Sequence, residues 1–217
     1  MPLDLANPDR KINVGIILTG GITEILDVAP IDLIHGMTPE LIAPLPLPEP
    51  MKAQALDLAF FWITEHGKPA RMSSGATMQA THSFANAPTI DIALMGAHNL
   101  GYNPSETELA YVRKVFDECA AFLTICGGFE NLLRAGLLVG KTATAPRFML
   151  PQLQKDAPNT KWVEQRWARD GKVWTTGALL CGPGMMRAFA QDTWHNKPEM
   201  VNIMLDIGNA PGRETAY

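Results

Sequence analysis

The sequence has little of what several classes of protein require. Only three of its 217 residues are cysteines. Cys119, Cys126 and Cys181 are too few for a disulfide scaffold and lack metal-ligand spacing, so we expect reduced thiols and no metal site. No apolar stretch approaches the length of a membrane span, and residues 1–10 are polar rather than signal-like, which favours a cytoplasmic protein. The formal net charge of −4 argues against a nucleic-acid or anionic-membrane partner.

The sequence also lacks the glycine-rich fingerprint of a dinucleotide-binding loop. Residues 135–142 imitate a phosphate-binding loop, but Ala135 stands where such a loop has its first glycine, and the segment leaves a predicted helix instead of a strand. We therefore expect no cofactor. Hydrophobic residues make up 47% and charged residues 18%, as in ordinary globular proteins. A chain of this length can bury one large core, so we expect a single domain over residues 1–217.

Short apolar runs alternate with helix-like segments along the chain. Strands are predicted for residues 12–18, 58–64, 90–95 and 120–125. Helices are predicted for residues 25–35, 105–119 and 129–138, and Ser105 and Glu108 have the spacing of a capping box. The alternation predicts a flavodoxin-like α/β fold, a three-layer sandwich with a mostly parallel central sheet and helices on both faces.

Two segments interrupt this alternation. Residues 38–50 are rich in proline, which cannot donate to a strand ladder, so we expect an extended loop there. Residues 162–167 and 173–176 predict a hairpin that turns at Asp170-Gly171. Two closing helices are expected to begin near Gly184 and Pro198.

The segment Ile-Cys-Gly-Gly-Phe at residues 125–129 carries the clearest chemical signal. A hydrophobic run delivers Cys126 to a sharp turn before a helix, which is the context of a nucleophile elbow. Gly127 and Gly128 would let a substrate approach the backbone, and the helix N-terminus would favour the thiolate. A buried structural cysteine is the alternative, but the two glycines and the strand-to-helix switch favour the elbow.

Three turns follow predicted strands or lead into predicted helices at the same edge of the sheet. They comprise residues 20–27, 96–100 and 126–129. Ligands of open parallel sheets bind beyond the carboxyl ends of the strands. The sequence therefore predicts one site built from these three turns.

The stretch from Thr124 to Thr144 resembles the ThiJ/PfpI superfamily, also called the DJ-one family, in its cysteine elbow, its Ala-Gly-Leu-Leu segment and its Gly-x-x-Ala-Thr segment. The likeness extends to most of the chain. Leu-Asp-Val-Ala-Pro at residues 26–30 looks most like the isocyanide hydratase branch of this class I glutamine amidotransferase-like group. The resemblance implies a cofactor-independent enzyme that acts on a small molecule, and it implies a homodimer.

The resemblance also implies which residues react. Cys126 would be the nucleophile, and Asp27 in the first loop would be its acidic, proton-shuttling partner. Glu24 is an alternative partner, because Pro30 follows Asp27 one residue sooner than in the hydratase pattern. Taken without the resemblance, an acidic residue at this helix entry is a cap or a dipole partner.

An oxyanion hole is implied next to the elbow. It would combine the amide of Gly127 with that of His98 or Ala97, in the loop that begins at Gly96. His98 stands where relatives usually have glycine. Two interpretations of His98 stay open: a general acid or substrate contact, and a side chain that projects from a surface loop.

Two departures from the family pattern narrow the chemistry. Protease-like and deglycase-like relatives carry a histidine where this chain has Gly127 or Pro146, so a Cys-His-acid triad and peptidase activity are not supported. Hydration of a polar triple bond has no leaving group and needs only a thiolate, an acid and water. We therefore expect hydratase or lyase chemistry, with a glyoxalase or deglycase and a redox-sensing cysteine protein as alternatives.

Overall fold

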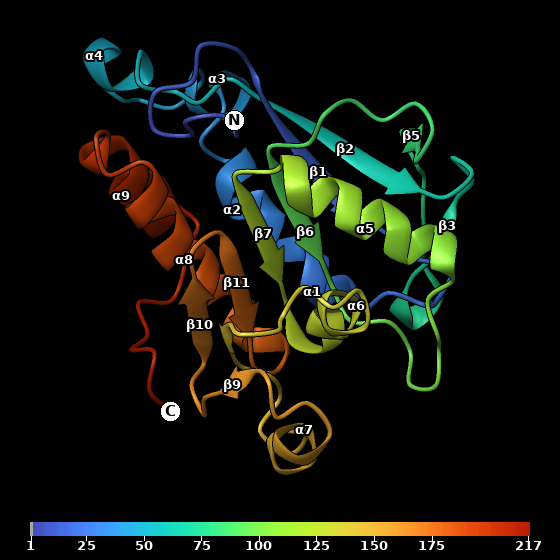
Figure 1. Cartoon of the computed structure of the whole chain (residues 1–217). Helices are drawn as coiled ribbons and strands as arrows, with labels where there is room; N and C mark the ends of the chain where they lie inside the picture. Colours follow the sequence, from blue (N-terminus) through green and yellow to red (C-terminus); the bar gives the residue numbers. More distant parts are fainter. Residues whose placement is uncertain (1) are drawn as a thin grey trace.

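A seven-stranded sheet crosses the centre of the computed structural model, which describes residues 2–217 (Figure 1). In spatial order its strands are β10 (Trp167–Asp170), β11 (Val173–Thr176), β7 (Ala121–Thr124), β6 (Ile92–Met95), β1 (Ile12–Ile17), β2 (Leu58–Thr64) and β5 (His82–Ser83). Every neighbouring pair is parallel except β10 with β11. The predicted α/β fold with a mostly parallel sheet is confirmed.

The central strands are buried on both faces. All residues of β6 and β7 are buried, and in β1 only Asn13 is not. A parallel strand between two helical layers needs apolar side chains on both faces, which explains why these strands are continuous apolar runs. Val14 pairs with Ile92, and Ile92 pairs with Ala121, so the carboxyl ends of the three strands meet at one edge.

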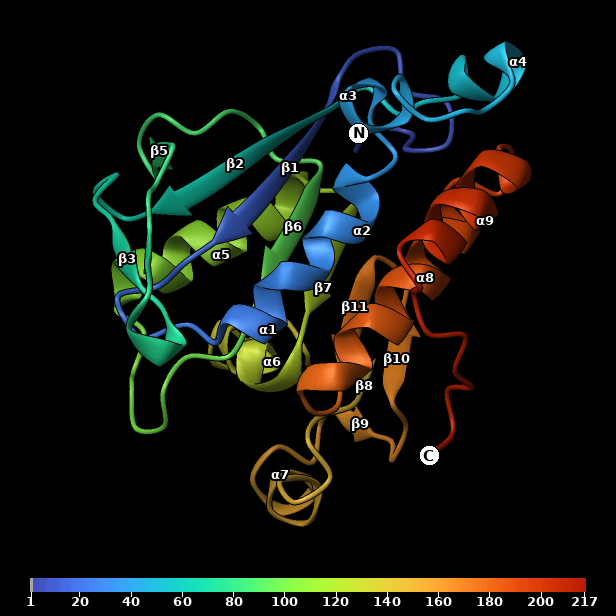
Figure 2. The same ribbon diagram turned by 180° about the vertical axis from the view of Figure 1, so that it is seen from behind.

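Helices cover both faces of the sheet. The face toward the viewer in Figure 1 is covered by α5 (Glu106–Glu118) and α6 (Phe129–Arg134). The other face (Figure 2) is covered by α1 (Ile25–Val28), α2 (Asp32–His35) and α8 (Gly182–Thr193). Helix α9 (Pro198–Ile207) packs against α8. Each face has its own apolar core. The capping box of α5 is confirmed, since Ser105 Oγ accepts from the Glu108 amide at 3.2 Å and the Ser105 amide donates to Glu108 Oε2 at 2.7 Å.

The prediction of a fully extended loop at residues 38–50 is wrong. This segment holds two single-turn helices, α3 (Pro39–Ile42) and α4 (Glu49–Lys52). Proline occupies the first turn of each helix, where its missing N–H group costs nothing and its fixed φ suits the helix. Proline therefore starts helices here instead of excluding them.

The predicted helix over residues 25–35 is interrupted, and the one over 129–138 is shorter than expected. Pro30 lies in a 3₁₀ turn, Ala29–Ile31, that separates α1 from α2. Helix α6 ends at Arg134, because Gly136 adopts a φ of +79° that stops it before Gly140.

The predicted hairpin is confirmed only in its second part. Strands β10 and β11 pair antiparallel and turn at Gly171, whose φ is +59°. Trp162, however, belongs to β9 (Lys161–Trp162), which pairs in parallel with β8 (Thr142–Ala143). The small pair β3 (Ala70–Arg71) and β4 (Thr77–Met78) and helix α7 (Leu150–Asp156) were not predicted.

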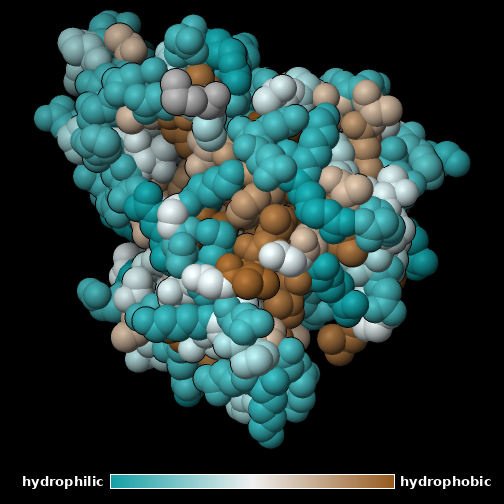
Figure 3. All heavy atoms as spheres, viewed as in Figure 1, coloured by the Kyte–Doolittle hydropathy of each residue, from teal (hydrophilic) through white to brown (hydrophobic). Residues whose placement is uncertain are grey.

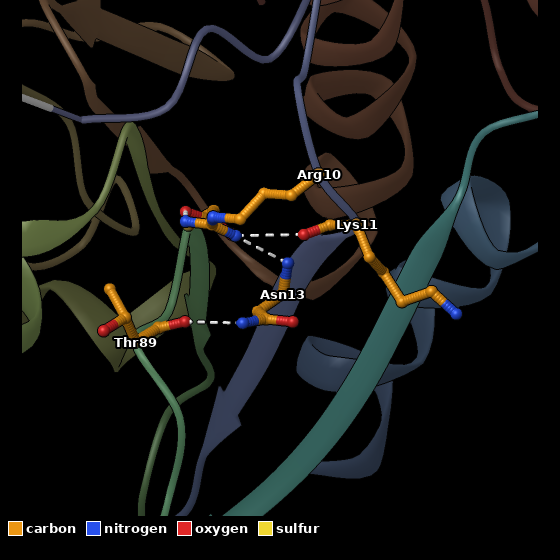
Figure 4. Close-up of polar contacts among 5 residues, drawn as sticks. Arg10, Lys11, Asn13 and Thr89 are labelled. Atoms are coloured by element: carbon orange, nitrogen blue, oxygen red, sulfur yellow. Dashed lines mark hydrogen bonds and ion pairs between the residues drawn. The ribbon is translucent and has the colours of Figure 1, made fainter.

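An ion pair fastens the amino-terminal ends of β1 and β6. Arg10 donates two hydrogen bonds of 2.8 Å to the buried carboxylate of Asp91, which also accepts from the Asn13 amide at 2.8 Å. Arg10 also donates to the Lys11 carbonyl, and the Asn13 side chain donates to the Thr89 carbonyl (Figure 4). This network lies at the edge of the sheet opposite to the predicted site.

Hydrophilic residues cover most of the face that Figure 3 shows, and apolar side chains reach the surface near its middle. Within residues 2–217, no helix has the length and apolar character that crossing a membrane requires.

Candidate active site

Cys126 sits on a strained turn between β7 and α6. Its φ is +55°, a left-handed value that a non-glycine residue rarely adopts. The turn is also crowded, because a methyl group at Gly128 would overlap the carbonyl oxygen of Met95, and one at Gly127 would lie 3.1 Å from Ala97 Cβ. The chain thus forms the predicted elbow, with glycines where the neighbouring loop approaches.

Residues after β11 hold the elbow in place. The Cys126 amide donates to the carbonyl oxygen of Gly177 and to the hydroxyl of Thr176, both at 3.1 Å. These contacts arise because β7 and β11 are parallel neighbours, so both chains leave the sheet at the same edge. Thr176 was predicted only as the last residue of a strand, and Gly177, which directly follows that strand, was not predicted as part of the site.

Asp27 of α1 is fully buried beside the elbow. Its Oδ2 accepts from the Ala97 amide at 2.8 Å, and its buried Oδ1 has no partner within residues 2–217. A methyl group at Gly96 would lie 2.7 Å from Asp27 Cβ. Glycine at position 96 is therefore what lets α1 place a carboxyl group against the loop after β6.

Asp27, Glu24 and Cys126 come together. Their closest oxygen and sulfur atoms all lie within 4.8 Å of one another. Glu24 precedes α1, and its amide donates to the Ala97 carbonyl at 3.1 Å. Both acids that the sequence analysis named therefore adjoin the thiol, and only Asp27 is fully buried.

Burial dominates the protonation of Asp27. Loss of water around the carboxyl raises its pKa from 3.8 to about 7, the Ala97 N–H group opposes the rise, and the charge of Glu24 adds to it. Near neutral pH this carboxyl group is thus divided between its acid and its carboxylate. A carboxylic acid of this kind can donate a proton at the pH where the protein works.

Backbone N–H groups at the turn favour the thiolate of Cys126, in the direction predicted for the helix N-terminus, but burial outweighs them in the resting site. Burial and then the charge of Asp27 raise the pKa of the Cys126 thiol to about 11, while the backbone N–H groups of Leu179 and Gly127 act against that rise. A protonated Asp27 no longer opposes a negative sulfur. Thiol and acid therefore titrate as a pair, and when the pair holds a single proton, the thiolate belongs to the less populated arrangement in which Asp27 carries that proton.

His98 does not join this cluster of reactive atoms. Its ring packs edge-on against Tyr102 with centroids 5.1 Å apart, and its Nδ1 lies 3.4 Å from the Asn99 carbonyl. Nε2 is buried and has no partner within the described part of the chain. Tyr102 in turn donates to the buried Glu108, which accepts from the Gly20 amide at 2.7 Å. The His98 ring thus belongs to the packing of the first loop.

The amide donors of the site differ from the expected set. Because the Ala97 amide donates to Asp27, it is not free to serve as an oxyanion donor. The backbone N–H groups that lower the pKa of the Cys126 thiol are those of Leu179, which was not predicted, and Gly127, which was. Leu179 begins a 3₁₀ turn, Leu179–Cys181, that leads into α8. The sequence analysis missed Leu179 because a backbone donor leaves no signature in a side chain.

A metal ion would have one place to bind among residues 2–217. Glu24, Asp27 and Cys126 are the single group of at least three His, Cys, Asp or Glu ligand atoms found close together there. A cation would have to displace the proton of a thiol whose pKa is about 11. The sequence-based expectation of no metal stays a prediction.

Comparison with known proteins places the chain in a family. The sequence pattern of the DJ-1/PfpI family matches residues 48–195, which is more than half of the chain. The protein therefore belongs to the DJ-1/PfpI family, as the resemblance implied. It is 28% identical over 149 residues to the isonitrile hydratase of Pseudomonas putida, and the aligned part is 66% of this chain and 63% of that enzyme. The match thus spans less than two thirds of the enzyme's length.

Solved structures share the fold. Drosophila melanogaster DJ-1beta matches with a TM-score of 0.72 and 16% identity, covering 93% of this chain and 100% of that one. A ThiJ/PfpI family protein from Pseudomonas syringae matches with a TM-score of 0.68 and 14% identity, covering 94% and 78%. At these identities the likeness bears on the fold alone.

Proposed function

We propose that the protein is a cofactor-independent, cysteine-dependent hydratase or lyase that converts a small electrophilic metabolite, with isocyanide hydration as the nearest chemistry. The observation that carries this proposal is the cluster of Cys126, Asp27 and Glu24 within 4.8 Å. Asp27 adds a buried Oδ1 that has no partner among residues 2–217, and a pKa of about 7. The family membership and the distant likeness to an isonitrile hydratase support it.

The cluster supports a complete reaction sequence. In the singly protonated pair, the Cys126 thiolate attacks the terminal isocyanide carbon and the proton held by Asp27 passes to the same carbon, which gives a thioimidate and the Asp27 carboxylate. A water molecule then adds to this carbon through its oxygen. The Asp27 carboxylate takes one of the two water protons, and the substrate nitrogen takes the second. Expulsion of the thiolate leaves the N-formamide, with Asp27 protonated again. The amides of Gly127 and Leu179 are the donors for negative charge that develops beside the sulfur.

The alternatives receive less support. Gly127 and Pro146 stand where deglycase-like and protease-like relatives have histidine, and His98 packs on Tyr102 rather than on the thiol. A redox sensor needs a cysteine with a low thiol pKa, whereas burial raises the pKa of Cys126 to about 11. Lactate formation from methylglyoxal, and sulfenic acid on Cys126 after mild peroxide, are the results that would favour these alternatives.

Turnover of a small panel of isocyanides and 2-oxoaldehydes tests the proposal. We expect formamide formation by the wild type and none above background by Cys126→Ala, because the covalent step needs the sulfur. Cys119→Ala removes a buried thiol that lies outside the site and is the matched control. Formamide formation by Cys126→Ala, or its absence in the wild type, would refute the hydratase proposal.

The two acids are separated by the same assay. Asp27→Asn keeps an acceptor for the Ala97 amide but cannot shuttle a proton, so we expect it to lose turnover. Glu24→Gln should keep turnover. The wild-type kcat/KM should rise as the pH passes about 7, because there the Asp27–Cys126 pair loses the first of its two protons and reaches the reactive form with one proton. Glu24→Gln should move this rise to lower pH, because the charge of Glu24 raises the pKa of Asp27. The opposite pattern of losses would assign the shuttle to Glu24.

A further inference from the structure

A chain of three backbone hydrogen bonds links residues 213–217 to the nucleophile. The Arg166 amide donates to the Thr215 carbonyl at 2.6 Å, the Gly177 amide donates to the Arg166 carbonyl at 2.8 Å, and the Cys126 amide donates to the Gly177 carbonyl at 3.1 Å. The Arg166 guanidinium adds a bond of 3.0 Å to the Glu214 carbonyl. Two segments, the one at Arg166 and the one at Gly177, therefore lie between residues 213–217 and the elbow.

Tyr217 is held at the end of this chain. Its ring lies 4.8 Å from the guanidinium carbon of Arg147 and 5.3 Å from that of Arg166. Its hydroxyl oxygen lies 3.9 Å from Cys181 Sγ. A methyl group at Gly177 would overlap this oxygen, so the hydroxyl occupies the space that a side chain at position 177 would need. Tyr217 is 44% exposed, and its ring and hydroxyl contact residues of three separate segments, those of Arg147, Arg166 and the stretch from Gly177 to Cys181.

Tyr217 thus touches both ends of residues 177–181, which we call the 177–181 turn. The turn starts at Gly177, whose carbonyl holds the Cys126 amide, and it closes where the Cys181 amide donates to the Ala178 carbonyl at 2.8 Å. Between these ends lies Leu179, whose backbone N–H group acts to lower the pKa of the Cys126 thiol. Whatever fixes the turn therefore also sets how that amide meets the sulfur.

We propose that Tyr217 is a positioning residue for Cys126, which fixes the 177–181 turn from its outer side and keeps the Leu179 amide directed at the sulfur. A tyrosine suits this task, because its ring has few rotatable bonds, its face attracts the two guanidinium groups, and its hydroxyl reaches Gly177 and Cys181 together. The catalytic importance of Tyr217 rests on the proposed function. Its effect on the thiol does not, because alkylation of Cys126 requires no turnover.

The pH dependence of Cys126 alkylation tests this role. The rate of reaction with iodoacetamide is followed at Cys126 by peptide mass spectrometry over a range of pH, in the full-length protein. With Tyr217→Ala we expect the profile to shift to higher pH, and the rate at a fixed pH below the midpoint to fall about fivefold, the worth of one hydrogen bond to the thiolate. Phe148→Ala removes an exposed ring next to Arg147 and should leave the profile unchanged.

A shield over the site would behave differently. If Tyr217 merely limited access, Tyr217→Ala would change the limiting rate at high pH and leave the midpoint where it is. That result, or an unchanged profile, would overturn the positioning role.

A second set of variants tests the contact itself. Gly177→Ala in the wild type forces its new methyl group against the Tyr217 hydroxyl, so it should shift the alkylation profile. In the Tyr217→Ala background this clash is gone, and the further shift caused by Gly177→Ala should largely disappear. Equal shifts in both backgrounds would overturn the proposal. If the wild type is alkylated at Cys126 but hydrates no isocyanide, the proposed function is refuted, and the alkylation profiles still test the positioning role of Tyr217.

Discussion

At the scale of residues, the site depends on two titratable groups buried against each other. Asp27 and Cys126 both have a raised pKa, about 7 and about 11, and burial is the largest cause for each. Neither group alone is a strong base or a ready nucleophile. As a pair they can hold one proton on either partner, which is what a reaction that first delivers and then recovers a proton requires.

The burial of Asp27 should cost stability at high pH. Its folded pKa of about 7 lies above the ordinary value of 3.8, so the folded state binds the proton more tightly than the unfolded state does. The associated stability is fully present below about pH 4 and is lost as the pH rises through 7. Relative to Asp27→Asn, the wild type should lose up to about 4 kcal/mol between about pH 4 and about pH 8.

Urea denaturation of both proteins across this range measures the loss. Asp57→Asn is a suitable control, because the Asp57 side chain is 66% exposed. Stability curves of the wild type and Asp27→Asn that stay parallel from acid to alkaline pH would show that the buried carboxyl group is not the cause.

The reactive side chains could be predicted from the sequence, and the backbone groups around them could not. Cys126 and Asp27 lie in short patterns of the family, and glycines flank the cysteine. Ala97, which with His98 was one of two alternatives for the second oxyanion donor, donates its amide to Asp27. Leu179 and Thr176 approach the elbow only because β7 and β11 are neighbours in the sheet, a pairing between segments about 50 residues apart that no local pattern encodes.

At the scale of elements, strands were predicted well because their burial on both faces leaves continuous apolar runs. The errors in the predicted elements lie in segments where proline or glycine can either start a helix, end it or interrupt it. Proline lies in the first turn of α3 and of α4, in a segment predicted to be an extended loop because proline cannot hold a strand ladder, and Gly136 ends α6 earlier than Gly140. Two-residue strands such as β8 and β9 carry no period that a sequence pattern could reveal.

The ion pair at the amino-terminal edge should stabilise the sheet. Asp91→Ala leaves the Asn13 amide without its acceptor and Arg10 without its partner, so we expect a loss of about 3 kcal/mol in the free energy of unfolding. Asp57→Ala removes the partner of Lys11 in an exposed pair and should cost at most about 0.5 kcal/mol. Chemical denaturation compares the two, and equal losses would contradict the role given to burial.

At the scale of the whole molecule, we propose that the protein is a homodimer. The proposal rests on the resemblance to the family. Light scattering should give a mass near twice the 23.7 kDa of the chain, and this mass should persist on dilution to micromolar concentrations. A mass of one chain at high concentration would contradict it.

The ends of the central sheet have a consequence for solubility during folding. One outer strand, β5, has only two residues, and the other, β10, carries the exposed Arg169, which pairs with Asp192 at 2.7 Å. Next to β10, the Arg166 amide is already taken by Thr215. An incoming strand from another molecule would find only two residues to pair with at the β5 border and a charged pair to bury at the β10 border. A sheet with such borders should resist edge-to-edge aggregation, even though its interior strands are long apolar runs.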